Sequence, residues 1–433
     1  MTINLVILLA IAMAIAIGYV FTINIGMIAI GFAYLIGAFI LGLTPSDLIA
    51  MWTTKLFFIL FTLTTFYGFA TTNGTLEKAA AKSIYLFRNL PYLIPLIIFL
   101  TSMMLGAIGA GVYAVVAFMV PIVMPVCTKT GMNRVLSILA IITGSTVGDN
   151  IPLIGTGGLL IRGIIEKTGY ADPSLTPISL GVSGNLALGE TSIVLVAYLL
   201  LKGWRVHTHD IEKPAPFTSQ QRKNLCLIAA VMFCMTMPTF FSVLFPGNAV
   251  LSFLRSKMDM TLLAVVGAII AHFLKLGDLK EITTKVVPWN TITVLCGMGL
   301  LIGVAVKAGT ITMLASFISK NIPPVMTIGL LIVVAGIMSF FSSTLAVVAP
   351  TLFPIVPIIA LSSVISPALL FGAIYVGSCG TGCSPFSSGG GIALASIADE
   401  KIKGETFSKL LLAPPLILVG LTILFVIKGI LGV

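Results

Sequence analysis

The sequence predicts an all-α polytopic membrane protein made of two inverted repeats, each with five spans and a re-entrant hairpin. The chain of 433 residues is 58% hydrophobic and only 9% charged, whereas soluble domains carry roughly 25% charged residues. Several apolar stretches approach the ~20 residues that a bilayer crossing needs. Two segments interrupted by Gly and Pro recur at one constant spacing, which indicates a secondary transporter with broken helices at the membrane midplane.

The first half of the chain predicts its elements in a clear order. The N-terminal apolar stretch lacks a cationic region and a small-residue cleavage site, so we expect a span and not a signal peptide. A glycine run at 106–111 predicts the bend of the hairpin. The expected elements are spans near 2–21, 24–43 and 56–72, an amphipathic helix near 75–88, a hairpin at about 91–128, a broken span near 135–161 and a span near 177–201.

A polar stretch separates the two halves and contains Pro214, Pro216 and Gln220. It defines three parts: a first inverted repeat at 1–201, a cytoplasmic linker at 202–223 and a second inverted repeat at 224–433. The second half repeats the order of the first. Its expected elements are spans near 224–245, 260–275 and 289–306, a short helix near 310–320, a hairpin at about 324–360, a broken span near 367–396 and a last span near 406–431.

The charge distribution supports the inverted arrangement. Five spans per half is an odd number, so the second half enters the membrane from the opposite side. Sixteen of the 24 Lys and Arg fall in the loops that would then face the cytoplasm, namely 73–89, 128–134, 202–223, 275–287 and 399–409. This bias agrees with the positive-inside rule. It also accounts for the net charge of +10 without a nucleic-acid partner. We expect a multi-pass protein of the cell inner (plasma) membrane, with the lipid bilayer as its surroundings.

The two broken spans are the candidate site. With a shift of 233 positions, Pro121 falls on Pro354, Gly144 on Gly377 and Pro152 on Pro385. In hydrocarbon every peptide group needs a partner, so such backbone survives only where protein buries it or where it lines a polar cavity. Half-helix N–H groups suit an anion, and freed carbonyls suit a cation. A packing glycine or a simple proline kink is the alternative reading of a single break, which two breaks at one register make less favourable.

Hydroxyl groups near the breaks and hairpin tips add candidate ligands. Hydroxyls in a span often only bond back to their own helix, but Ser342, Ser343 and Thr344 follow one another at a bend in a repeated hairpin. No Lys or Arg lies within either break, so N–H groups, hydroxyls and an amide would have to hold an anionic substrate. The candidate substrate ligands are Ser145, Thr146, Asn150, Ser342, Ser343, Thr344, Ser378, Thr381, Ser384 and Ser387.

Asp149 is the acidic residue that this interpretation places deepest in the membrane. An intramembrane carboxylate is a functional hypothesis by default, and Asp149 could hold a cation or carry a proton. A carboxylate satisfied by neighbouring hydroxyls near the membrane surface is the alternative. Its counterpart in the other repeat is Gly382. Glu190 is a second candidate, which would be unremarkable if it lay at the outer interface. The candidate sodium ligands are Asp149, Gly144, Gly109 and Gly377, the glycines through backbone carbonyls.

No resident cofactor is expected, apart from Na⁺ as a possible coupling ion. The six cysteines lie mostly in apolar segments and are expected to be small buried hydrophobes. His207 and His209 fall in the linker, without a Cys or His cluster around them.

The chain resembles a known family. It is similar to the ion transporter superfamily, specifically to dicarboxylate carriers of the malonate-carrier type, which are related to divalent anion–sodium symporters. The resemblance covers essentially the whole chain. It is clearest in Asn73-Gly74-Thr75, in Pro288-Trp289-Asn290-Thr291, in Ser342-Ser343-Thr344 and in Ser384-Pro385-Phe386-Ser387-Ser388-Gly389-Gly390. It implies a homodimer with a scaffold and a moving transport domain, working as an elevator that carries small dicarboxylates with sodium or by exchange.

One departure from the family pattern keeps the coupling open. Sodium-coupled relatives carry Ser-Asn-Thr at both hairpin tips, whereas the first tip here has Gly109-Ala110-Gly111 and no side-chain oxygen. We therefore expect a secondary active transporter of malonate or C4-dicarboxylates, cation-coupled. The alternatives are a dicarboxylate or anion exchanger without sodium, and an inorganic-ion or cation/proton antiporter of the same superfamily.

Other functional classes fit less well. An intramembrane aspartyl protease needs two aspartates that share a proton, and no second Asp lies in a predicted span. A primary pump would carry a GxxxxGK[ST] loop, which the sequence lacks. We therefore do not expect an enzyme.

Overall fold

The computed structural model is all-helical, which confirms the predicted fold class at that level. It describes residues 2–431 apart from 22, 87–88, 153, 207–212, 245–247, 249, 251–252, 255–256, 259, 341–342, 364 and 398. Throughout these described ranges the chain forms helices and turns and no β-strand.

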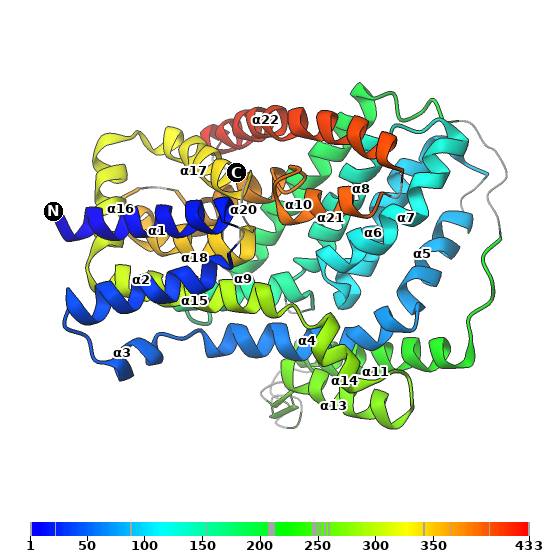
Figure 1. The fold of residues 1–433 in the computed structure, drawn as a ribbon, viewed down its shortest axis with the longest axis horizontal. Coiled ribbons are helices and arrows are strands. Elements are labelled where there is room, and N and C mark those ends of the chain that lie inside the picture. Colours follow the sequence, from blue (N-terminus) through cyan, green and yellow to red (C-terminus); the bar gives the residue numbers. More distant parts are fainter. Residues whose placement is uncertain are drawn as a thin grey trace. The chain divides into compact units, whose positions relative to one another are not determined.

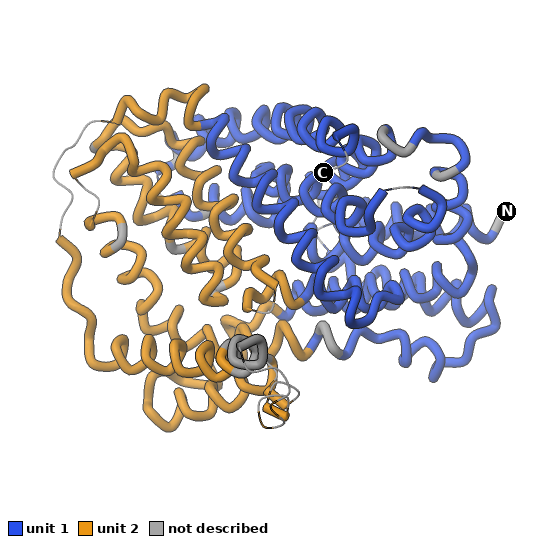
Figure 2. The backbone as a smooth tube through the Cα atoms, turned by 180° about the vertical axis from the view of Figure 1, so that it is seen from behind, with its two compact units in different colours: residues 1–57, 160–197, 289–433 blue, residues 58–159, 198–288 orange. Residues whose placement is uncertain are grey.

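Two compact units make up the chain (Figure 2). Unit 1 comprises Met1–Phe57, Leu160–Ala197 and Trp289–Val433, and unit 2 comprises Phe58–Leu159 and Tyr198–Pro288. Each unit draws on both predicted repeats, so compact units and repeats are two different divisions of the chain. The first break falls in unit 2 and the second in unit 1.

Unit 1 contains all the described helices that follow residue 288 (Figure 1). Its helices are α1 (Thr2–Val20), α2 (Ile25–Phe39), α3 (Pro45–Ala50), most of α9 (Thr156–Lys167) and of α10 (Leu175–Leu200), α15 (Trp289–Lys307), α16 (Thr310–Asn321), α17 (Pro324–Phe340), η4 (Thr344–Val348), α18 (Ala349–Leu352), η5 (Phe353–Ile355), α19 (Val356–Ser362), α20 (Pro367–Gly380), α21 (Ser388–Ala395) and α22 (Glu400–Leu431).

Unit 2 contains the first hairpin and the first half of the first broken span. Its helices are most of α4 (Thr54–Thr72), α5 (Thr75–Leu86), η1 (Pro91–Leu93), α6 (Ile94–Leu105), η2 (Gly106–Ala110), α7 (Val112–Thr130), α8 (Arg134–Asp149), α11 (Ser219–Leu244), α13 (Met260–Phe273), α14 (Leu279–Glu281) and η3 (Ile282–Val286).

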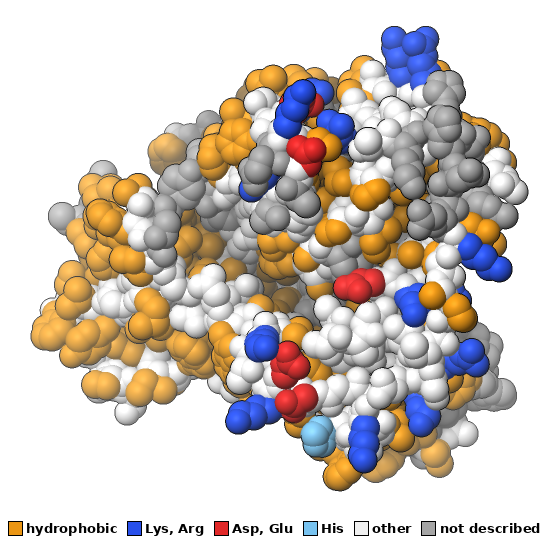
Figure 3. All heavy atoms as spheres, turned by 45° about the vertical axis from the view of Figure 1, so that its right-hand side comes forward, with side chains coloured by type: hydrophobic (Ala, Val, Ile, Leu, Met, Phe, Trp, Pro, Cys, Tyr) orange, Lys and Arg blue, Asp and Glu red, His pale blue; other side chains and the backbone are white. Residues whose placement is uncertain are grey.

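The helices have the length and surface of membrane spans. Among the described residues, five helices of at least 18 residues are apolar enough to cross a bilayer, and seven shorter helices are also apolar. Helix α22 exposes Leu412, Leu416, Val419 and Ile423 along its length, as a helix facing lipid would. Figure 3 shows hydrophobic side chains over wide areas of one face, while charged side chains gather in a few patches. The chain is therefore built as a multi-pass membrane protein.

The repeated sequence is also a repeat of local structure. Asn133 caps the N-terminus of α8 and Ser366 caps that of α20, and these residues are 233 positions apart. Helix α8 packs closely against α6, and α20 packs in the same way against α17. A Cβ at Gly144 would lie 2.3 Å from the Phe99 carbonyl oxygen, and a Cβ at Gly377 would lie 2.3 Å from that of Ile332. Both helix pairs therefore touch through their backbones at equivalent positions.

Both hairpins leave α-helical geometry near their tips. Segment η2 is π-helical, with Gly109 at φ 90° inside it and Gly111 at φ 75° after it. Glycine is the residue that takes these left-handed angles without strain, which is why the glycine run bends the chain here. In the second hairpin the π-helical segment η4 also lies near the tip, directly after the positions 339–343 that correspond to η2.

The C-terminal end of the linker is fixed on unit 2. Lys78 Nζ on α5 donates to the Pro216 carbonyl at 3.3 Å, and Lys82 Nζ lies 4.2 Å from the centroid of the Phe217 ring. Gln221 donates to the Asn73 carbonyl at 3.0 Å. The linker end and the start of α5 therefore lie on one side of this unit. The predicted loop residues His207 and His209 are outside the described residues.

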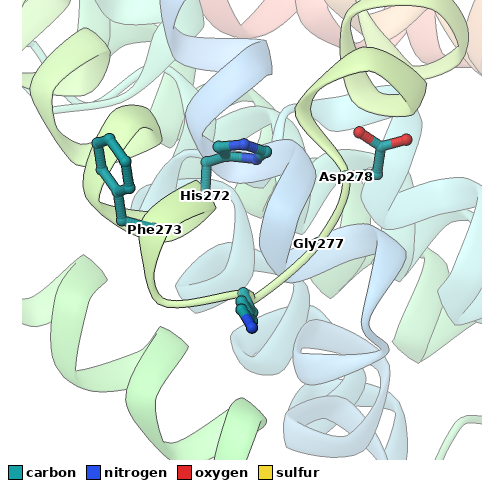
Figure 4. Close-up of a pocket in the computed structure, with 5 residues that line it drawn as sticks. His272, Phe273, Gly277 and Asp278 are labelled. Carbon is teal, nitrogen blue, oxygen red and sulfur yellow. The ribbon is translucent and has the colours of Figure 1, made fainter.

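A surface pocket lies at the turn after α13 (Figure 4). It is lined by His272, Phe273, Lys275, Gly277 and Asp278. None of the residues that the sequence singles out for transport belongs to this pocket, so we place the candidate site at the breaks.

Candidate functional site

The first broken span interrupts its helix where the sequence predicts it. Helix α8 ends at Asp149 and α9 begins at Thr156. Asn150 closes α8 by donating its side-chain amide to the Thr146 carbonyl at 2.7 Å. Pro152 then follows in the break, where its missing N–H needs no partner. The described chain between the half-helices is non-helical. Asn150 and Gly155 are buried, and Ile151, Pro152 and Ile154 are half-buried.

Asp149 connects the two half-helices. Its side chain is only 3% exposed, and Oδ2 accepts from the Gly157 N–H at 3.1 Å and interacts with the backbone N–H of Thr156. The carboxylate therefore caps the N-terminus of α9, which favours negative charge there. Oδ1 is buried without a hydrogen-bond partner among the described residues. One oxygen of Asp149 is committed to the fold and the other is available to a cation or a proton.

Glycines allow this close arrangement. A Cβ at Gly155 would lie 1.9 Å from the Asp149 carbonyl oxygen, and a Cβ at Gly157 would lie 2.6 Å from Asp149 Oδ2 and 2.7 Å from Asn150 Oδ1. The start of α9 therefore packs directly on the carboxylate and the amide. We expected the N–H groups of this half-helix to suit an anion, and the anion that they hold here is Asp149 itself.

The second broken span closes in a related way but without charge. Helix α20 ends at Gly380 and α21 begins at Ser388. The Gly390 N–H donates to the Gly382 carbonyl at 3.1 Å, and these residues are the counterparts of Gly157 and Asp149. Ser387 caps α21 by accepting from the Gly390 N–H at 3.3 Å, and its hydroxyl donates to the Gly382 carbonyl at 2.7 Å. The two breaks therefore share their hydrogen-bonding plan, and only the first one contains a carboxylate.

Hydroxyls on the two half-helices before the breaks are fully buried. Ser145 Oγ donates to the Ile142 carbonyl and Ser378 Oγ to the Tyr375 carbonyl, each at 2.9 Å. Thr381 Oγ1 donates to the carbonyl of Gly336 on α17 at 3.0 Å. Its counterpart in the first break is Gly148 on α8, where a Cβ would lie 1.9 Å from the Met103 carbonyl oxygen. In this conformation these hydroxyls donate their hydrogens to backbone carbonyls, so only their oxygen lone pairs are free.

The remaining hydroxyl candidates lie at the second hairpin and within the second break. Thr344 Oγ1 lies 3.1 Å from Ser339 Oγ, and Ser343 caps η4 by accepting from the Ala346 N–H. Ser384 Oγ accepts from the Phe386 N–H at 3.2 Å. Ser342 is outside the described residues.

Tyr67 on α4 is a polar residue of this region that the sequence does not single out. A Cβ at Gly109 would lie 2.1 Å from a ring carbon of Tyr67, so the ring covers the left-handed bend of the first hairpin. The Tyr67 hydroxyl is buried without a partner among the described residues, and it interacts electrostatically with Asp149. A tyrosine in a span next to Thr65 and Phe66 carries no signal of its own, because its neighbourhood depends on tertiary packing.

The candidate residues divide between the two units. Unit 2 holds Gly109, Gly144, Ser145, Thr146, Asp149 and Asn150, and unit 1 holds Ser343, Thr344, Gly377, Ser378, Thr381, Ser384 and Ser387. In unit 2, a Cβ at Gly106 would lie 2.5 Å from the Ser145 carbonyl oxygen, so the hairpin bend touches the half-helix that carries Asp149. In unit 1, Thr381 connects its half-helix to α17. Each unit thus assembles one break beside one hairpin.

The described residues offer oxygen ligands at the first break. They include no group of three or more His, Cys, Asp and Glu side chains that could hold a metal ion. Carboxylate, hydroxyl and carbonyl oxygens are the groups available, and hard cations prefer such ligands.

Comparison with known proteins supports the predicted resemblance over the first third of the chain. Residues 1–149 match the family model described as the N-terminus of the dicarboxylate carrier protein MatC. The resemblance to dicarboxylate carriers is therefore confirmed for this part, which includes the first hairpin and α8 up to Asp149. A search of curated proteins found no match.

Solved structures give a second comparison. The YdaH transporter of Alcanivorax borkumensis, whose crystal structure was described as having an unusual topology, matches with a TM-score of 0.58 and 13% identity. The match covers 89% of this chain and 88% of that chain. At this identity the likeness shows the fold, which is that of a known transporter.

Proposed function

We propose that this protein is a secondary active transporter that carries small dicarboxylates, malonate or C4-dicarboxylates, across the cell membrane. The observation that carries the proposal is the pair of broken spans, which close with hydrogen bonds at equivalent positions. Duplicated discontinuous helices of this kind are typical of secondary transporters. The match of residues 1–149 to a dicarboxylate carrier family supports this substrate class.

A dianionic substrate needs a compensating charge in this protein. The nearest basic side chain after the first break is Arg162 on α9, and it is already bound to Asp172 at 2.9 Å and to the Thr176 hydroxyl at 2.9 Å. The Thr176 hydroxyl and then Arg162 hold the pKa of Asp172 below its usual range. With this arginine occupied and Asp149 adding negative charge, a co-transported cation is the simplest source of balance. We propose Na⁺ or H⁺ as that cation, with Asp149 as its ligand.

Uptake into proteoliposomes tests this function. Labelled malonate, succinate and citrate are offered with and without an inward sodium gradient, and with and without an inward proton gradient. We expect malonate or succinate to accumulate above its external concentration when one of these gradients is present. Citrate, with a third carboxylate, should be taken up more slowly.

Two rival functions give different results in the same assay. An anion exchanger is favoured by the first hairpin tip, Gly109-Ala110-Gly111, which has no side-chain oxygen; it would need internal dicarboxylate and would ignore both gradients. A cation/proton antiporter is favoured by the free oxygen of Asp149, and it would move cations while taking up none of the three acids.

An elevator mechanism and a homodimer complete the proposal. Both come from the resemblance to dicarboxylate carriers, in which a transport domain moves against a scaffold that holds the dimer together. Cross-linking in the membrane, followed by uptake measurements on the linked protein, would show whether two chains associate and whether one part must move.

Membrane orientation gives a test of the inverted repeats. Single cysteines at Lys78, Lys213 and Arg255 are probed with an impermeant thiol reagent in a background without native cysteines. We expect positions 78 and 213 to react from the cytoplasmic side and position 255 from the opposite side. The contact of Lys78 with Pro216 supports the first pairing. Labelling of 213 and 255 from one side would contradict the inverted arrangement.

Ser378 and Thr381 give a test of the substrate ligands. To hold a dicarboxylate, the Ser378 and Thr381 hydroxyls must donate to it in place of the backbone carbonyls of Tyr375 and Gly336. Loss of such a hydrogen bond to a charged group costs about 1.5–3 kcal/mol, so Ser378→Ala and Thr381→Ala should raise the half-saturation constant for uptake roughly ten- to hundredfold. Thr381→Ser keeps the hydroxyl that reaches Gly336 and serves as the matched control. If Thr381→Ala lowers only thermal stability and leaves the half-saturation constant unchanged, the hydroxyl is a helix bridge and not a ligand.

A further inference from the structure

Glu190 on α10 is the most isolated ionisable group in the described part of the chain. Its side chain is 0% exposed. Neither Oε1 nor Oε2 has a hydrogen-bond partner among the described residues. The sequence alone left open that Glu190 lies at the outer interface with water, but the structure buries it inside the protein. The transport mechanism proposed above makes no use of it.

The helices around Glu190 present apolar groups at this level. A Cβ on the adjacent Gly189 would lie 2.7 Å from Val376 on α20 and 3.4 Å from Leu421 on α22. One turn away on α10, Ile193 is buried and lies within 3.6 Å of a Cβ placed at Gly380. Helix α10 therefore packs on α20 and α22 through apolar side chains at the positions on either side of the buried Glu190.

The elements packed against α10 carry two titratable groups, Cys383 and Lys428. The Cys383 thiol of the second break is buried and interacts electrostatically with it. Lys428 on α22 is directed to Asn185 instead, with Nζ 2.8 Å from Asn185 Oδ1. Asn185 in turn donates to the Ala368 carbonyl at 3.1 Å. Within the described residues no basic side chain forms an ion pair with Glu190, and its own helix α10 adds no cation next to it.

Comparison with Asp149 shows why this environment matters. Asp149 receives backbone N–H groups from the start of α9, and such bonds stabilise a carboxylate. From the described residues Glu190 receives none, and an ionised carboxylate among apolar groups without a partner is very costly. A protonated acid in the same place is far less costly. The surroundings of Asp149 in unit 2 therefore favour a carboxylate, whereas those of Glu190 in unit 1 favour a protonated acid.

From this geometry we propose that Glu190 is a proton-binding site, which holds a proton in this conformation and gives it up to water when the second break moves and exposes it. The step transfers one proton from the carboxylic acid to water and changes no other bond. Cys383 provides the physical connection, because it belongs to the break and interacts electrostatically with Glu190. The inference does not rest on the proposed function, since protonation can be measured without any substrate.

Carbodiimide labelling tests the protonated state directly. A hydrophobic carbodiimide adds to a protonated carboxylic acid in apolar surroundings and leaves a stable N-acylurea, which peptide mass spectrometry locates. We use the full-length protein in lipid nanodiscs at a series of pH values, and the exposed Glu77 as an internal control. Glu190 should be modified by the hydrophobic reagent and resist a water-soluble one, while Glu77 should react with the water-soluble reagent. Absence of Glu190 modification at every pH, in protein that remains folded, would overturn the proposal.

Glu190→Gln provides a second and independent measurement. Glutamine has the shape of the neutral acid and cannot carry the proton. Infrared difference spectra recorded across a pH change should show the C=O band of a protonated carboxylic acid in the wild-type protein and lose it in the variant. A proton titration should show about one proton per chain fewer released by the variant. Equal proton release and an unchanged acid band in both proteins would show that Glu190 is not the site.

Discussion

Asp149→Asn is expected to abolish substrate accumulation driven by an ion gradient. Asparagine keeps the size of the side chain and one oxygen that can still accept from the Gly157 N–H, which lies 3.1 Å from Oδ2 in the wild-type protein. It replaces the other oxygen, which has no partner among the described residues, by an NH₂ group. An NH₂ group cannot coordinate a cation and cannot take up a proton at ordinary pH. The cap of α9 is therefore kept and the proposed coupling group is removed.

The size of this effect follows from the energy that the gradient supplies. A tenfold gradient of one monovalent ion is worth about 1.4 kcal/mol, which is a tenfold concentration of substrate. In proteoliposomes with such a gradient, the ratio of internal to external dicarboxylate should fall from about tenfold to about one. Exchange of external labelled substrate for internal unlabelled substrate should survive, because it moves no net ions.

Glu77→Gln is the matched control for Asp149→Asn. It removes one carboxylate with the same chemical change, at an exposed position on α5, and should accumulate substrate like the wild type. If Asp149→Asn still accumulates substrate with unaltered sodium and pH dependence, the carboxylate only caps α9. The coupling cation would then have to be held by backbone carbonyls, for which Gly144 and Gly377 are the sequence-based candidates.

The breaks could be predicted from the sequence because their causes are local. Glycine and proline terminate a helix through their own backbone properties, so Pro152 and Pro385 mark the non-helical segments wherever the rest of the chain lies. The caps at Asn133 and Ser366 follow from side chains that bond to the next few N–H groups. Such features repeat whenever the sequence repeats.

The hydrogen-bond and packing partners of the polar side chains could not be predicted from the sequence, because they depend on how the helices pack. Asp149 is held by N–H groups several residues further along the chain, and this contact forms only because Gly155 and Gly157 let α9 approach. Thr381 reaches Gly336 across a helix interface, so its type alone cannot distinguish a bridge from a ligand. Tyr67 lies over Gly109 through the packing of α4 on the hairpin. The division into two units also crosses the repeat boundaries, and no composition signal marks it.

The crossing glycines should be the most sensitive positions for folding. Gly144 on α8 and Gly377 on α20 each lie against a carbonyl oxygen of the neighbouring helix, and a Cβ would come within 2.3 Å of it in both cases. The contacted atom is backbone, so it cannot move away as a flexible side chain could. Small residues at such crossings are what allow membrane helices to pack tightly.

Gly144→Ala and Gly377→Ala are therefore expected to destabilise the protein by similar amounts. Overpacking of a tight interface costs about 1–3 kcal/mol and occasionally more, and we expect each variant at or above about 3 kcal/mol because a helix must shift. Thermal unfolding in detergent, followed by the loss of the monodisperse peak in size-exclusion chromatography, measures the effect. Gly184→Ala on α10 and Gly420→Ala on α22 are matched controls, since a Cβ at either position meets nothing within 4 Å. They should unfold like the wild type or slightly later, because alanine is the better helix former. Equal stability of all four variants would mean that α8 and α20 do not pack this closely on α6 and α17, and would remove the physical basis for treating the two breaks as one repeated structure.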